Sequence, residues 1–161
     1  MSSRSQENHD HFFKFTNQSK RSDIGVKYGR TYVQDSRFLI CWIEAKRLPT
    51  PDVSHRDPRE YVFVDKENYK GGGGIHRFKM SKHAPKLNYA IMIAYIQSNT
   101  YDYWLDKLNG YIKSLIEIDS SWNEKDLIKP LFSKENNRFI SVHTRAAVVP
   151  DITIRHFWIH L

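Results

Sequence analysis

The stretch that most constrains the fold is the apolar run 38–45, which reads Phe-Leu-Ile-Cys-Trp-Ile-Glu-Ala and continues into Lys-Arg-Leu. Side chains alternate between the two faces of a strand, and along most of this run both alternating sets are apolar. Such a strand is buried on both faces, as in the centre of a sheet that helices cover. The run therefore predicts an α/β protein with a mixed β-sheet flanked by helices.

Two charged residues interrupt the end of this run. Glu44 and Lys46 are two residues apart, so we expect them on one face of the strand. Asp23 begins a short β-branched run that can supply a neighbouring strand. Carboxylates are the ligands that Mg²⁺ and Mn²⁺ prefer, and a metal beside a lysine can assist phosphodiester hydrolysis. The pattern predicts a metal-dependent nuclease site in which Asp23, Glu44 and the carbonyl of Ala45 hold the ion and Lys46 is catalytic.

Simpler interpretations exist for these residues. Glu44 and Lys46 can form an ordinary salt bridge where a strand reaches solvent. Asp35 competes with Asp23 as the second carboxylate, but it lies in a polar Gln-Asp-Ser-Arg turn, where aspartate is common. A Lys46 ammonium beside carboxylates and a metal stays protonated, which favours an electrostatic role over that of a general base.

Composition supports a polyanionic partner. The 161 residues suit one domain, and a net charge of +7 with a pI near 9.5 favours nucleic acid or an anionic surface. No apolar run approaches the roughly 20 residues of a membrane span, and the polar N-terminus lacks a signal-peptide centre. The single cysteine, Cys41, excludes an internal disulfide and is interpreted as a small buried apolar residue. We expect a cytoplasmic, nucleic-acid-binding protein.

The other elements follow from periodicity and turn residues. We expect strands over 24–28, 30–33 and 89–96, an amphipathic helix over 101–118, and two closing strands over 138–143 and 152–160 that form an antiparallel pair. Residues 1–20 are expected to contain a short helix over 5–18, and 65–75 a mobile glycine-rich loop. Residues 49–58 form a proline-rich loop, and 59–64 are either helix or strand. The whole is interpreted as one domain, 1–161.

The set formed by Asp23 and the later Glu44-Ala45-Lys46 resembles the PD-(D/E)xK nuclease superfamily. Together with the motif Gly-Gly-Ile-His-Arg-Phe at 73–78, it is similar to small bacterial restriction-endonuclease-like proteins of poorly known function. A small defence or toxin protein whose partner supplies specificity is a further possibility. The resemblance runs from Asp23 to the C-terminus. It implies a restriction-endonuclease-like αβββαβ core that hydrolyses DNA or RNA, with Asp23 and Glu44 as metal ligands and Lys46 as the catalytic lysine.

The chain also departs from this family. Ser22 stands in place of the motif's proline, and Glu7 is the one glutamate available for the extra ligand that many relatives carry on their first helix. Nuclease relatives often form homodimers, and we expect DNA more than RNA as the substrate. Four basic residues are candidates for phosphate contacts: Arg47, Arg77, Lys79 and Lys82.

The remaining motifs are interpreted without a catalytic or ligand-binding role. The glycines at 71–74 lack the Gly-Lys-Ser/Thr ending of a P-loop. His156 and His160 share a strand face without a zinc-type ligand set, so we interpret them as surface or lightly buried residues. Ser141 and His143 are not interpreted as part of a catalytic triad. The alternative function is a non-catalytic nucleic-acid-binding or interaction module on the same fold, in which the three site residues do not converge.

Overall fold

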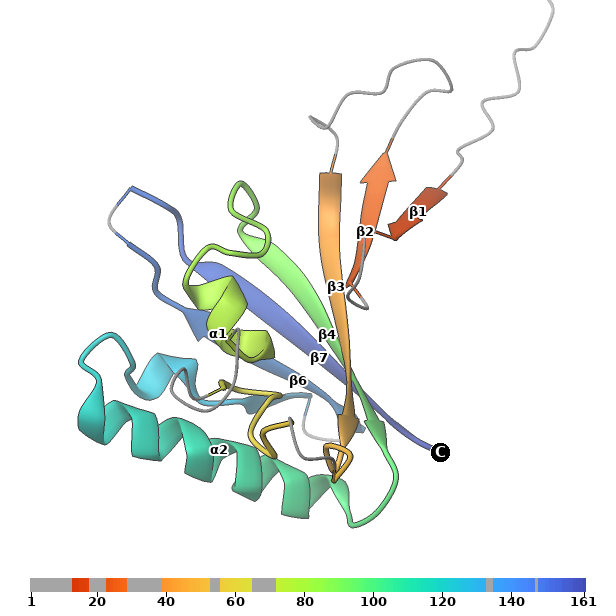
Figure 1. The fold of residues 1–161 in the computed structure, drawn as a ribbon, viewed down its shortest axis with the longest axis vertical. Coiled ribbons are helices and arrows are strands. Elements are labelled where there is room, and N and C mark those ends of the chain that lie inside the picture. Colours follow the sequence, from red (N-terminus) through yellow and green to blue (C-terminus); the bar gives the residue numbers. More distant parts are fainter. Residues whose placement is uncertain are drawn as a thin grey trace, which may run out of the picture.

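A seven-stranded mixed sheet forms the centre of the molecule (Figure 1). The computed structural model describes the backbone of residues 13–17, 23–28, 39–52, 56–64, 72–132, 135–146 and 148–161, and within these ranges the side chains from residue 41 on, 135 and 136 excepted. The strands are β1 (Phe13–Asn17), β2 (Asp23–Tyr28), β3 (Leu39–Leu48), β4 (Tyr89–Ile96), β5 (Lys129–Phe132), β6 (Glu135–His143) and β7 (Ile152–His160). Their order across the sheet is β1-β2-β3-β4-β7-β6-β5.

The sheet has a parallel centre and antiparallel flanks. β3, β4 and β7 run parallel to one another, whereas β1, β2 and β3 form an antiparallel meander on one side and β7, β6 and β5 another on the other side. The short helix α1 (Gly74–Lys79) precedes β4, and α2 (Tyr101–Ile118) follows it. The chain is therefore an α/β protein with a mixed sheet.

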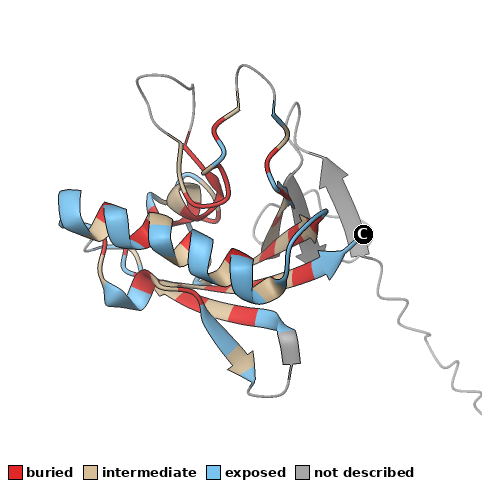
Figure 2. Cartoon of the chain, turned by 90° about the horizontal axis from the view of Figure 1, so that it is seen from below, coloured by how far each residue is buried: buried red, intermediate tan, exposed pale blue. Residues whose placement is uncertain are grey.

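Both helices lie on the same face of the sheet (Figures 1 and 2). Along β4, and along β7 as far as Trp158, every second residue is buried and the alternate ones are half-buried. The buried set packs with the apolar side of α2, formed by Trp104, Leu108, Ile112 and Leu115. Among the described residues, both helices that flank the sheet lie on this one face. Neither described helix combines the length and the apolarity that crossing a membrane requires.

The expected elements with the strongest periodicity are confirmed. The strand over 89–96 and the helix over 101–118 have the predicted bounds, and Thr100 caps α2 by accepting a hydrogen bond from the amide of Tyr103. β6 and β7 form the predicted antiparallel pair. The strand expected over 30–33 lies outside the described residues, and 58–62 are a turn rather than a helix or strand. β5 was not predicted.

The helix expected over 5–18 is corrected in its described part. Residues 13–17 form β1, which pairs with β2. The physical reason is the pattern Phe-Lys-Phe-Thr, in which apolar residues recur every second position, the period of a strand and not of a helix. Glu7 and the rest of that region lie outside the described residues.

The glycine-rich segment also differs from the expected mobile loop. Residues 65–71 lie outside the described part, but Gly72, Gly73 and Gly74 are buried and lead directly into α1. The amide of Gly74 donates to the carbonyl of Glu60, and that of Ile75 to the carbonyl of Tyr61. The absence of side chains lets the start of α1 approach the turn at 58–62 and its neighbour Phe63 closely.

This close approach predicts opposite effects for two glycine substitutions. A Cβ on Gly73 would lie 2.5 Å from backbone atoms of Phe63, so we expect Gly73→Ala to destabilise the fold by about 2 kcal/mol or more. Gly110 lies in the middle of α2 with open space around its Cβ position, so Gly110→Ala should stabilise by about 0.5–1 kcal/mol. Urea unfolding of both variants measures the difference, and equal effects would contradict the packing.

Candidate active site

The carboxylate of Glu44 is the centre of the candidate site. Glu44 lies on β3, with a side chain only 1% exposed, and faces the helix-bearing side of the sheet together with its neighbours Met92 on β4 and His156 on β7. A buried carboxylate needs compensating charge or hydrogen bonds. Basic side chains supply that compensation.

Three basic groups surround this carboxylate. Lys46 Nζ lies 2.8 Å from Oε1, Arg77 Nη1 lies 3.7 Å from the same oxygen, and His83 Nδ1 lies 3.2 Å from Oε2. Lys46 follows on the same strand face, Arg77 comes from α1, and His83 from the turn after α1. Their side chains are 14%, 11% and 14% exposed, so the cluster is partly open to solvent.

Glu44 is ionised at neutral pH. Burial by itself raises its pKa, but the hydrogen bond from His83 and the positive charge of Lys46 outweigh burial and lower the pKa to about 2. An ionised carboxylate only accepts hydrogen bonds, so His83 carries its proton on Nδ1 and donates a hydrogen bond from there to Oε2. Oε1 is buried and is paired with the Lys46 ammonium 2.8 Å away. Both carboxylate oxygens of Glu44 therefore face basic groups.

Aromatic rings hold the His83 imidazole in place. The ring of Trp42, two residues before Glu44 on β3, lies 5.0 Å from that of His83 between centroids, and the ring of Phe78 on α1 meets it edge-on at 5.6 Å. Such contacts restrict the orientation of the imidazole. His83 is a site residue that the sequence interpretation missed, since nothing in a single sequence marks a histidine that reaches β3 from a turn 39 residues later.

The predicted second carboxylate occupies the register position directly opposite. Asp23 on β2 pairs with Glu44 on β3 in the antiparallel ladder. Directly opposed positions of such a ladder share one face of the sheet. The side chain of Asp23 lies outside the described part of the structure, as do all atoms of Asp35. The backbone thus brings the Asp23 and Glu44 positions together as the sequence predicted.

The other predicted residues have varied placements. Ala45 is half-buried on the opposite face of β3, and Arg47 and Lys82 are exposed. Lys79 requires a correction: it is 3% exposed and its ammonium forms a buried ion pair with Asp126, 2.9 Å away, so it is not a surface phosphate contact. Its position on the inner side of α1 explains the difference, since a buried charge requires a buried partner.

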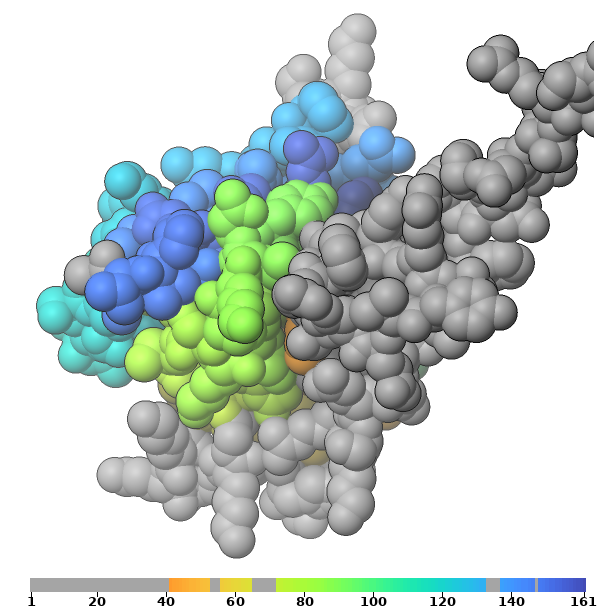
Figure 3. Space-filling view, turned by 90° about the horizontal axis from the view of Figure 1, so that it is seen from above, coloured from red at the N-terminus to blue at the C-terminus, as the bar shows by residue number. Residues whose placement is uncertain are grey.

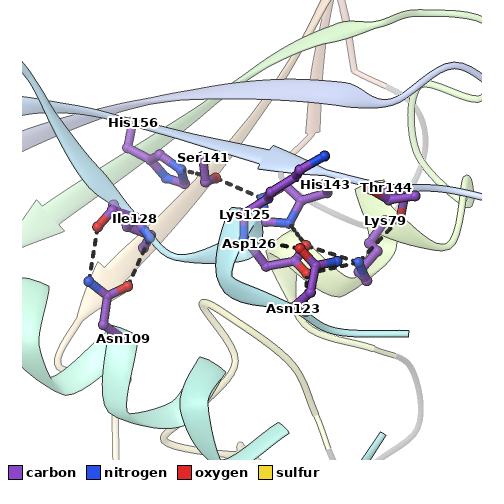
Figure 4. A network of polar contacts seen from close by, with 10 residues as sticks. All are labelled: Lys79, Asn109, Asn123, Lys125, Asp126, Ile128, Ser141, His143, Thr144 and His156. Atoms are coloured by element: carbon purple, nitrogen blue, oxygen red, sulfur yellow. Dashed lines mark hydrogen bonds and ion pairs between the residues drawn. The ribbon is translucent and has the colours of Figure 1, made fainter. Parts of the chain in front are cut away.

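A buried polar network adjoins the site (Figure 4). Asp126, at the end of the 3₁₀ helix η2 (Glu124–Asp126), accepts hydrogen bonds from Lys79, from His143 Nδ1 at 2.5 Å and from the amide of Asn123. Ser141 Oγ lies 2.7 Å from His143 Nε2 and 2.8 Å from His156 Nε2. Figure 4 shows these groups in one row from α1 across η2 to β6 and β7.

The hydrogen bonds of this network have one consistent direction. His143 donates from Nδ1 to the Asp126 carboxylate, so the neutral ring accepts from Ser141 at Nε2. Ser141 then accepts from His156 Nε2, and His156 Nδ1 accepts from the hydroxyl of Tyr61 at 2.8 Å. Every polar group in the row is satisfied, which is the condition for burying it.

The network corrects two assignments. His156 is fully buried rather than near the surface, because Ser141 and Tyr61 satisfy both its nitrogens. Asp126, His143 and Ser141 do form a triad-like chain, which the sequence interpretation did not expect. Ser141 is 2% exposed and held between two imidazoles, so its hydroxyl does not face a substrate. The buried position expected for Cys41 is confirmed.

Comparisons with known proteins leave the family open. No family model, curated protein or solved structure matches the chain. Among the described residues, no three histidine, cysteine, aspartate or glutamate side chains form a group able to hold a metal ion, and the side chain of Asp23 is not part of that set.

Proposed function

We propose that this protein is a metal-dependent nuclease with a restriction-endonuclease-like core, in which Asp23 and Glu44 bind Mg²⁺ or Mn²⁺ and Lys46 acts on the scissile phosphate. The observation that carries the proposal is the register pair of Asp23 and Glu44, with Lys46 Nζ 2.8 Å from the Glu44 carboxylate. Carboxylate oxygens on adjacent strands beside a lysine are what metal-assisted phosphodiester hydrolysis requires.

The donor set fits a hard divalent cation. Glu44 is ionised, and a carboxylate oxygen is the kind of ligand that such a cation prefers. Asp23 stands opposite, and the carbonyl of Ala45 is the third predicted oxygen. When bound, such an ion polarises the phosphate and lowers the pKa of a coordinated water.

The chain's own residues have separable tasks in this proposal. The Lys46 ammonium stabilises negative charge that develops on the phosphate oxygens and orients the attacking water. Arg77 and His83 hold the Glu44 carboxylate, Arg77 at Oε1 and His83 at Oε2. Arg47 and Lys82 are exposed and contact the nucleic-acid backbone, which gives binding that weakens with salt. DNA is the favoured substrate.

A second candidate function has its own supporting observation. Lys46, Arg77 and His83 already neutralise Glu44, whose side chain is 1% exposed. A carboxylate compensated in this way can be a purely structural element. The chain would then be a nucleic-acid-binding module that keeps the fold without cleavage.

A cleavage assay separates the two functions. We expect the protein to cut supercoiled plasmid, single-stranded DNA or RNA with Mg²⁺ or Mn²⁺ and to stop in chelator. Lys46→Ala should lower the rate about 100-fold or more, since it removes a charge that acts on the transition state. Lys113→Ala, at an exposed position of α2, is the matched control and should cleave like the wild type.

Binding to the same nucleic acids, measured by fluorescence anisotropy in chelator, completes the design. Cleavage lost in Lys46→Ala with binding retained supports the nuclease. Binding by all three proteins with no cleavage by any of them favours the non-catalytic module.

A further inference from the structure

The two basic groups that α1 and its following turn bring to Glu44 need support from elsewhere in the fold. Arg77 and His83 are six residues apart in one stretch, on a helix of only 6 residues and a turn. In Figure 3 this stretch, in green, lies at the surface against the blue segment that follows β6. A short helix has little stability of its own, so contacts with neighbouring segments must hold it.

The turn that carries His83 has a strained backbone. Ser81 and Ala84 flank His83 and have φ angles of 56° and 50°, in the left-handed region. Residues other than glycine adopt this region at a cost of about 1–2 kcal/mol each, and it persists where surrounding contacts impose it.

Arg145 makes such contacts. This residue follows β6, is 6% exposed, and donates hydrogen bonds from its guanidinium to three backbone carbonyls. These are the carbonyls of Ala84 at 3.1 Å, Leu87 at 2.6 Å and Pro150 at 2.7 Å. The planar guanidinium can serve three acceptors in fixed directions, which an ammonium group at one point cannot. Arg145 therefore fixes the turn at both ends of the stretch 84–87.

Thr144, the residue before Arg145, contacts α1 through its backbone carbonyl. The Lys79 ammonium at the end of α1 donates to the carbonyl of Thr144 at 3.2 Å and to both oxygens of Asp126. It also lies 5.1 Å from the centroid of the Trp122 ring. These contacts fix the end of the helix two residues after Arg77.

We propose that Arg145, with Lys79 and Asp126, forms a positioning clamp that places His83 and Arg77 against the Glu44 carboxylate. The clamp acts through the backbone of 79–87 and touches neither substrate nor Glu44. Its consequence for cleavage rests on the proposed function, whereas its consequence for His83 does not.

The test is the conservative variant Arg145→Lys in the full chain. A lysine keeps the charge but cannot reach the three carbonyls together, so the turn relaxes and His83 leaves Glu44. We expect the ¹⁵N signal of His83 Nδ1, assigned with His83→Gln, to shift toward that of the exposed His160, with the signals of His143 and His156 unchanged. Arg138→Lys, at an exposed position of β6, is the matched control and should change none of them.

The kinetic readout is separate. With a cleavable substrate, we expect kcat of Arg145→Lys to fall about tenfold or more while KM stays within about twofold, because Glu44 loses the groups that position it. If the wild type cleaves nothing, the proposed function fails and the NMR result still decides the clamp. An unchanged His83 signal in folded Arg145→Lys overturns it.

A second variant tests the clamp in case Arg145→Lys does not fold. If Arg145→Lys also loses the His156 signal, the same spectra are recorded on Lys79→Met/Asp126→Asn, which removes both buried charges at once. A His83 signal displaced there, with that of His156 retained, supports the clamp, and an undisplaced one overturns it.

Discussion

Asp126→Asn should destabilise the fold by about 3–5 kcal/mol, the largest effect that we expect from any single substitution outside the apolar core. The substitution leaves Lys79, whose side chain is 2% exposed, without its carboxylate partner. It also removes the charged acceptor that fixes the proton on His143 Nδ1. Urea unfolding at pH 7 measures the loss.

The controls separate charge from position. Glu124→Gln, at an exposed position of the same 3₁₀ helix, should change stability by less than about 0.5 kcal/mol. Lys79→Met/Asp126→Asn should recover most of the loss, because no uncompensated charge stays buried. A double variant as unstable as Asp126→Asn would mean that the ion pair is not the cause.

Mild acid should destabilise the protein through its buried histidines. Burial, together with the nearby His143, lowers the pKa of His156 from 6.5 to about 3, and burial also lowers the pKa of His143. Below pH 6.5 a histidine of the unfolded chain binds a proton, whereas His156 in the folded protein stays neutral until the pH approaches 3. Its contribution to stability is therefore complete above pH 6.5 and is lost as the pH falls toward 3.

The window from pH 6.5 to 4.5 isolates this effect, because the pKa of Glu44 is about 2 when folded and 4.5 when unfolded. His156 alone should cost about 2–3 kcal/mol of unfolding free energy across it. His156→Gln should flatten the pH dependence, whereas the exposed His160→Gln should leave it unchanged. Equal slopes for wild type and His156→Gln would contradict the assignment.

The sequence was most informative where one physical signal dominates. The alternating run of β4 and the helical spacing of Trp104, Leu108 and Ile112 determine their elements because burial of one face is the main driving force. The positions of the two acidic residues and the lysine also followed from local rules. Glu44 and Lys46 share one face of β3, and Asp23 begins the β-branched run that forms the neighbouring strand β2.

Local rules of this kind do not predict contacts between segments that are distant in the sequence. His83 reaches Glu44 across 39 residues, and Tyr61 reaches His156 across 95. Lys79 was interpreted as a surface cation because its partner Asp126 lies 47 residues away. In the sequence, a buried charged or polar residue looks the same as a solvent-exposed one. Only the tertiary structure, which brings its partner close, distinguishes the two.

The position of β7 has a consequence for how the chain is made. Of the described strands, β7 comes last in sequence but lies between β4 and β6 in the sheet. A ribosome releases the N-terminal segments first, so β4 keeps an unpaired edge until Ile152–His160 emerges. Unpaired strand edges are prone to aggregation. A chain translated only as far as Asp151 would therefore expose this edge of β4, and we expect it to aggregate more readily than a chain that includes β7.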